Sequence, residues 1–113
     1  MLFRSDEVLV VEPLEPRLDV VSSPGFKSFL VDRINDGCKY LTLNLRRLEF
    51  IDSSGLTAVV STLKTLRLGG GDMSVCEVPQ NIGQLFKITK LDRVFGMFLT
   101  EDEAVDALRK GLA

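Results

Sequence analysis

The residues best suited to chemistry form one short run, Phe-Ile-Asp-Ser-Ser-Gly-Leu, at positions 50–56. The run lies between a segment that is typical of a buried strand and a segment with the apolar spacing of an amphipathic helix. Small hydroxyl residues at such a turn can cap the helix, or they can expose a hydroxyl group for chemistry. On the residue types alone, capping is the simpler explanation for Asp52, Ser53 and Ser54, and a regulatory or reactive serine stays an alternative.

Catalysis would lack its usual groups in this chain. The sequence contains no histidine, so a Ser-His-Asp triad cannot be built. Neither Ser53 nor Ser54 lies in a Gly-x-Ser-x-Gly turn. Cys38 and Cys76 are far apart and do not form a Cys-x-x-Cys pair, which predicts two reduced cysteines, at least one of them buried in a strand. We therefore predict a protein that is not an enzyme and that needs no cofactor and no metal ion.

Composition narrows the class of protein and its partners. A chain of 113 residues fits one domain, residues 1–113, with a core from about 8 to 108. The net charge of −2 and the lack of a basic stripe argue against nucleic acid as a partner. The longest apolar run, Val8 to Val11, is too short for membrane insertion. Because Asp6 and Glu7 lie where a signal peptide would be apolar, we expect a cytoplasmic protein.

Strand and helix patterns alternate along most of the chain. This order predicts an α/β fold with a mixed, mostly parallel sheet of four to five strands and about four helices. We expect the first two strands to form a hairpin-like edge, and Leu41, Leu43 and Leu45 to share one face of a central strand. Strands are expected at residues 8–11, 18–20, 40–45, 73–78 and 94–99, and helices at about 23–34, 56–68, 80–86 and 101–110.

The helix ends carry local signals. Ser22 and Ser23 before Pro24 suit a helix start, and three glycines at 69–71 should end a helix. Thr100 and Glu103 have the spacing of a capping box. In open α/β sheets, functional residues gather at the carboxyl ends of the strands, which is where the run at positions 50–56 is expected.

Several segments together resemble the STAS domain, the family of anti-sigma-factor antagonists. The most specific is the run at 50–56 after the strand Leu-Thr-Leu-Asn-Leu at 41–45. Pro-Arg-Leu-Asp at 16–19 resembles a Gly-x-Leu-Asp segment of the family, and weaker likenesses are Met-Ser-Val-Cys at 73–76 and Leu-Phe at 85–86. The resemblance covers the chain from about Val8 to Leu108.

The resemblance implies a switch. Members of this family bind an anti-sigma factor that is also a serine kinase, and so release a sigma factor. The kinase uses ATP to phosphorylate a serine at the start of the second helix, which ends the interaction, and a serine phosphatase resets it. By position, the resemblance makes Ser54 the phosphorylated residue. It also implies a partner-binding surface at Asp19, Asp52, Ser53, Gly55 and Leu56.

Further expectations concern the setting of this serine. Gly55 should leave room for a kinase active site, and the amide groups at the helix start should tolerate the phosphate. Pro16 replaces the usual glycine of the family, and Arg46 and Arg47 make the strand end more basic. Either arginine could reach the kinase or the phosphate. We expect a monomer or a weak dimer.

Two other roles are open to a STAS-like domain. One is an accessory subunit of a membrane lipid-transport complex, which needs no phosphorylation. The other is part of a stressosome-type assembly. An intact serine at position 54 favours the switched antagonist over both.

Overall fold

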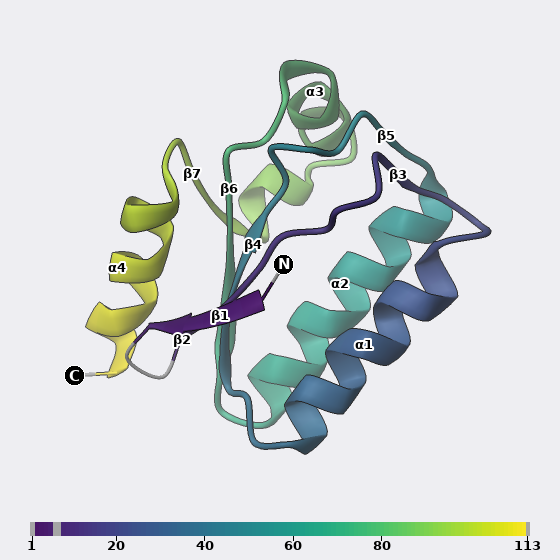
Figure 1. The fold of residues 1–113 in the computed structure, drawn as a ribbon. Coiled ribbons are helices and arrows are strands. Elements are labelled where there is room, and N and C mark those ends of the chain that lie inside the picture. Colours follow the sequence, from purple (N-terminus) through teal and green to yellow (C-terminus); the bar gives the residue numbers. More distant parts are fainter. Residues whose placement is uncertain (1, 6–7, 113) are drawn as a thin grey trace.

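The structure of the protein is a computed structural model, and it describes residues 2–5 and 8–112 of the chain. Within this part, four α-helices and one 3₁₀ turn alternate with seven short strands (Figure 1). The strands are β1 Leu2–Ser5, β2 Val8–Val11, β3 Arg17–Leu18, β4 Tyr40–Asn44, β5 Phe50–Ile51, β6 Asp72–Cys76 and β7 Gly96–Phe98. The helices are α1 Ser23–Asn35, α2 Ser53–Leu68, α3 Gln80–Ile88, η1 Leu91–Arg93 and α4 Glu101–Leu112.

The main sheet has the strand order β1-β2-β4-β6-β7. Strands β1 and β2 are antiparallel, whereas β2–β4, β4–β6 and β6–β7 are parallel pairs. This confirms the predicted mixed, mostly parallel sheet, with the strand of alternating leucines at its centre. Strands β3 and β5 form a separate two-stranded parallel sheet.

The antiparallel edge corrects one prediction. We expected the strand at 8–11 to form a hairpin with the segment at 18–20, but β2 pairs with β1 instead. Because β2 is bonded to β1 on one side and to β4 on the other, it has no free edge for a further strand. The segment around Leu18 therefore pairs with β5, where Leu18 lies opposite Ile51.

Helices cover both faces of the main sheet. Figure 1 shows α1 and α2 side by side on one face and α4 on the other. Three leucines that alternate along β4 and its end are fully buried in the larger cluster: Leu41, Leu43 and Leu45. On the α4 side, the smaller cluster consists of Val8, Val10, Val105 and Leu108, with Tyr40 packed against it.

The helix ends follow the sequence signals in part. Gly69–Gly71 ends α2, and the Thr100 hydroxyl caps α4 by accepting the N–H of Glu103 at 3.2 Å. The Glu103 carboxylate accepts the Thr100 hydroxyl rather than a backbone N–H. Ser22 precedes α1 as expected, but its hydroxyl donates to the carbonyl of Arg17 and does not cap the helix. None of the helices in the described residues has the length and apolar character needed to cross a bilayer.

Candidate functional site

Two loops meet at the carboxyl ends of β3 and β5. Because Leu18 pairs with Ile51, Asp19 and Asp52 follow the two strands at equivalent positions. The N–H of Asp52 donates to the carbonyl of Leu18 at 3.2 Å. In return, the N–H of Val20 donates to the Asp52 carboxylate at 3.1 Å. This small sheet therefore brings two predicted site residues from distant parts of the chain into one place.

Asp52 is the N-cap of α2. Its Oδ1 accepts the N–H groups of Ser54 at 2.9 Å and Gly55 at 3.1 Å, and its backbone carbonyl accepts the N–H of Leu56 at 3.0 Å. The capping role considered for Asp52 is thus confirmed. The amides at the helix start were expected to tolerate a phosphate, but those of Ser54 and Gly55 are already bonded to this carboxylate.

Asp19 organises the loop before α1. Its Oδ1 accepts the N–H groups of Val21 and Ser22, each at 3.1 Å, and its Oδ2 accepts Nε of Arg17 at 3.1 Å. The backbone N–H of Ser22, followed by the Arg17 guanidinium, holds the pKa of Asp19 below its ordinary value of 3.8. Asp19 is therefore an ionised residue that shapes the loop, and its contact with a partner stays a prediction.

The two serines differ in exposure. Ser53 is exposed and Ser54 is half-buried, one position further into α2. Among the described residues, neither hydroxyl forms a hydrogen bond of its own. A kinase substrate needs a hydroxyl that is not held by the protein interior, and Ser54 meets this condition. Phosphorylation of Ser54 stays a prediction.

Ser54 lines a groove between the first turns of α1 and α2. The volume of this groove is about 430 Å³. Its lining combines residues of both helices and of the loop before α1: Val20, Ser23, Pro24, Lys27, Ser53, Ser54, Thr57 and Ala58. Ser53 also lines a second groove, which lies beyond α2 toward η1 and contains Lys64. Ser53 thus lies at the border of two hollows, one on either side of α2, and Ser54 lines only the first of them.

Gly55 faces inward, toward the small sheet. A Cβ atom at this position would lie 2.3 Å from the carbonyl oxygen of Leu18 and 2.6 Å from Cγ1 of Ile51. Only glycine allows α2 to approach β3 and β5 so closely. Gly55 is buried, and Leu56 packs against the larger core cluster. Both residues pack on the inner side of the first turn of α2, which carries the serines. Direct contact of Gly55 or Leu56 with a partner stays a prediction.

Exposed apolar side chains next to the site were missed by sequence reasoning. Val20 and Val21 are 68% and 85% exposed, and Phe50 is 40% exposed. The Arg17 guanidinium lies 4.2 Å from the centre of the Phe50 ring. The sequence did contain a signal for these exposed side chains. Val20 and Val21 are adjacent valines in a polar turn before a helix, outside the apolar stripe of any helix or strand.

Arg46 and Arg47 form ion pairs with one buried carboxylate. Nε of Arg46 lies 2.8 Å from Oε1 of Glu12, and Nε of Arg47 lies 2.8 Å from Oε2. The Glu12 side chain is 1% exposed, whereas the two arginines are about half exposed. No sequence pattern indicated these two ion pairs. Contact of either arginine with a kinase or a phosphate stays a prediction.

The cysteines agree with the sequence analysis. Neither forms a disulfide bond within the described residues, and Cys76 is fully buried in β6. Burial raises the pKa of the Cys76 thiol to about 12. The described residues contain no group of three or more potential metal ligands.

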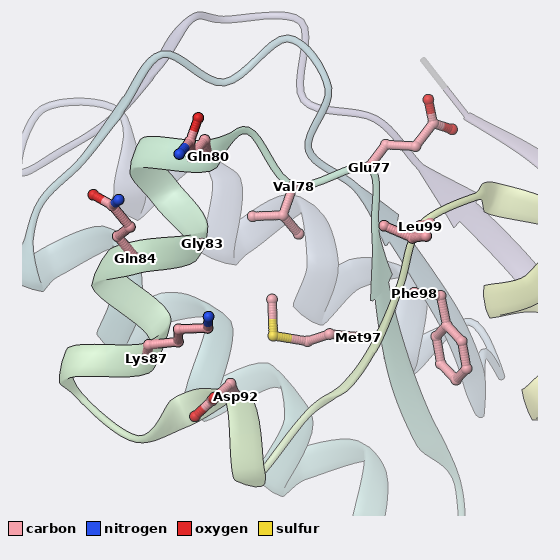
Figure 2. Close-up of a pocket in the computed structure, with 10 residues that line it drawn as sticks. All are labelled: Glu77, Val78, Gln80, Gly83, Gln84, Lys87, Asp92, Met97, Phe98 and Leu99. Carbon is pink, nitrogen blue, oxygen red and sulfur yellow. The ribbon is translucent and has the colours of Figure 1, made fainter.

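Another hollow lies away from the serines, between α3 and β7, and has a volume of about 570 Å³ (Figure 2). Figure 2 shows Gln80, Gln84 and Lys87 along α3 and the thioether of Met97 between α3 and β7. None of the predicted site residues lines it.

Comparison with known proteins gives a consistent result. A family model described as STAS domain matches residues 2–104. The anti-sigma-B factor antagonist of Staphylococcus aureus is 35% identical over 74 residues, which cover 66% of this chain and 68% of that protein. The crystal structure of a candidate anti-sigma factor antagonist from Thermotoga maritima has a TM-score of 0.90 and 26% identity, covering 96% of this chain and 93% of that one. SpoIIAA of Bacillus, solved in its phosphorylated form, shares the fold with a TM-score of 0.72 and 23% identity, covering 95% of this chain and 96% of that one.

Proposed function

We propose, from the premise that this chain belongs to the STAS domain family, that it is an anti-sigma factor antagonist switched by phosphorylation of Ser54. The observation that carries the switch is the hydroxyl of Ser54 in the first turn of α2, which forms no hydrogen bond of its own within residues 2–5 and 8–112. The names of the relatives from Staphylococcus aureus and Thermotoga maritima support the antagonist role.

In the unmodified state, the protein would bind an anti-sigma factor with serine kinase activity and so release a sigma factor. The proposed docking surface contains the two loops after β3 and β5 with the start of α2. Asp19, Asp52 and Ser53 supply its polar part, and the exposed Val20 and Val21 supply apolar area. A polar surface with an apolar centre is typical of specific protein interfaces.

Phosphorylation would end the interaction. Oγ of Ser54 attacks the γ-phosphorus of ATP, the bond to the β-phosphate oxygen breaks, ADP leaves, and the hydroxyl proton passes to the kinase. The product carries about −1.5 to −2 additional charges at neutral pH. Charge mismatch at a buried interface contact costs roughly 2–5 kcal/mol, which lowers affinity by about one and a half to nearly four powers of ten. Asp52 makes the surroundings more negative still. A serine phosphatase would restore binding.

This role is one of binding rather than catalysis, and it would be exercised in the cytoplasm. The alternatives, an accessory subunit of a lipid-transport complex or part of a stressosome-type assembly, share the domain. No feature of the described residues favours either over the switched antagonist.

The test uses three variants. We expect Ser54→Ala to abolish phosphorylation by a purified anti-sigma factor kinase of the source organism with labelled ATP, while Ser53→Ala, the matched control, is still phosphorylated. We expect Ser54→Asp to weaken binding of the same kinase, measured by calorimetry, without loss of the cooperative melting transition in circular dichroism. Wild-type affinity of Ser54→Asp for the kinase would refute the switch.

A further inference from the structure

The groove between the first turns of α1 and α2 contains groups that suit a phosphate. Ser54 lines it together with Lys27, Ser23 and Thr57. We propose that the phosphoryl group on Ser54 lies in this groove, where Lys27 is its counterion and the hydroxyl of Ser23 donates to one of its oxygens. This inference rests on the proposed function, and it concerns what holds the phosphate once it is attached.

Three of the backbone donors that usually hold a phosphate at a helix start are already bonded here. Phosphates at helix N-termini are held by backbone N–H groups and by the helix dipole. In α2, the N–H groups of Ser54 and Gly55 donate to the Asp52 carboxylate, and the N–H of Leu56 donates to its backbone carbonyl. A phosphate on Ser54 would also lie near this carboxylate and be repelled by it. A cation and a donor from the neighbouring helix α1 would offset this repulsion.

Ser23 offers an unpaired donor at the buried wall of the groove. The residue is only 5% exposed, and its Oγ has no hydrogen-bond partner among the described residues. A buried hydroxyl without a partner is unfavourable, because it has lost its bonds to water without replacement. An oxygen of the phosphate is a strong acceptor and would satisfy this hydroxyl after a rotation about χ1 turns Oγ from the wall into the groove. The unpaired state of Ser23 is thus explained if the groove is built for an anion.

Lys27 supplies the charge. It is the cationic residue among those that line the groove, and its side chain is exposed on α1, which packs beside α2. A flexible ammonium group on a neighbouring helix can follow a phosphate without reshaping the fold. Thr57 lies three residues after Ser54 on α2, on the same helix face, and adds a hydroxyl.

The test measures the phosphate itself, in the absence of any partner. Phosphoserine is incorporated at position 54 during translation, and the second pKa of the phosphate is followed by ³¹P NMR. In the otherwise wild-type chain, we expect this pKa about half a unit or more below its usual value of about 6, because a neighbouring cation favours the dianion.

The matched variants are Lys27→Gln and Lys64→Gln. Both replace an exposed lysine, Lys27 on α1 and Lys64 on α2, but Lys64 lines the second groove, which does not contain Ser54. Lys27→Gln should raise the phosphate pKa toward its usual value, and Lys64→Gln should leave it unchanged. An unchanged pKa in Lys27→Gln, or an equal rise in both variants, would overturn the proposal.

Ser23→Ala tests the buried donor. Without the phosphate, removal of an unpaired buried hydroxyl should leave the denaturation midpoint equal to or above that of the wild type. With phosphoserine at 54, the same substitution should raise the phosphate pKa, and an unchanged value would overturn the role of Ser23. These results are separate from the partner switch. If the groove does not hold the phosphate, the proposed switch is unaffected, because the added charge would still disturb binding of the partner. If phosphorylation does not control binding, the kinase assays alone would show it.

Discussion

At the scale of single residues, the site depends on two side chains and on the absence of a third. Asp52 fixes the start of α2, Asp19 fixes the start of α1, and Gly55 lets α2 approach the small sheet. The capping role of Asp52 could be predicted from sequence, because the partners of an N-cap are its own neighbours in the chain. The packing of Gly55 could not, because it depends on Leu18, which is brought near only by the fold.

Gly55 and Gly25 allow a controlled test of this packing. Each is the third residue of its helix, but a Cβ at Gly25 would meet nothing within 4 Å. We expect Gly55→Ala to lower the free energy of unfolding by about 1–3 kcal/mol, because α2 must move away from the small sheet. Gly25→Ala should raise it by about 0.4–1 kcal/mol, because alanine reduces the freedom of the unfolded chain.

Urea denaturation of both variants checks this pair of predictions. A Gly55→Ala variant as stable as Gly25→Ala would mean that the close approach of α2 to Leu18 does not hold in solution.

At the scale of elements, the loop between β4 and β5 is tied down at several points. Arg46 and Arg47 bind the buried Glu12 at the end of β2. The N–H groups of Glu49 and Phe50 donate to the carbonyl of Pro16, ahead of β3. This loop leads directly into the serines, so its anchoring sets where α2 begins. Sequence patterns indicate the helices and strands but not these ion pairs and hydrogen bonds, because an interaction between distant residues leaves no periodic signal.

The ion pairs predict an asymmetric response to mutation. The double variant Arg46→Ala/Arg47→Ala removes both cations from a buried carboxylate and should cost about 3–5 kcal/mol of unfolding free energy. Glu12→Gln leaves two half-exposed arginines that water can solvate, and should cost less, about 1–2 kcal/mol. Arg33→Ala, which breaks an exposed pair with Asp36, is the control and should cost about 0–1 kcal/mol.

Chemical denaturation at neutral pH measures all three. The explanation would be wrong if Glu12→Gln destabilised the protein more than the double arginine variant did.

At the scale of the whole molecule, the sequence predicted the central strands and helices better than the strands at the edges of the fold. The leucines of β4, the apolar stripe of α2 and the glycines after it identified the central layers correctly, since each has a clear period or stop signal. Strand β1 was missed because Leu2–Ser5 is short and contains a charged residue. The β3–β5 pair was missed because a two-residue ladder is defined by its partner and not by its own sequence.

The two faces of the sheet should differ in stability. Helix α2 packs into the larger core cluster, whereas α4 rests on the smaller cluster through Val105 and Leu108. We expect Leu63→Ala in α2 to cost about 2–5 kcal/mol and Leu108→Ala in α4 to fall at or below the lower end of that range. Amides of α4 should also exchange with solvent before those of α2, because regions with few buried apolar contacts open first.

Hydrogen exchange followed by mass spectrometry, with denaturation of the two leucine variants, compares the faces directly. Equal protection of α2 and α4 would show instead that the two faces unfold as one unit.

The order of the strands has a consequence for the newly made chain. All of the predicted partner-binding residues precede position 57, yet β4 needs β6 beside it, and α2 packs against β6 as well. A nascent or truncated chain that ends before β6 therefore holds every recognition residue without the sheet that arranges them. We expect such fragments not to compete for the partner. Only chains long enough to fold would then contribute to the concentration of antagonist that is able to bind the anti-sigma factor.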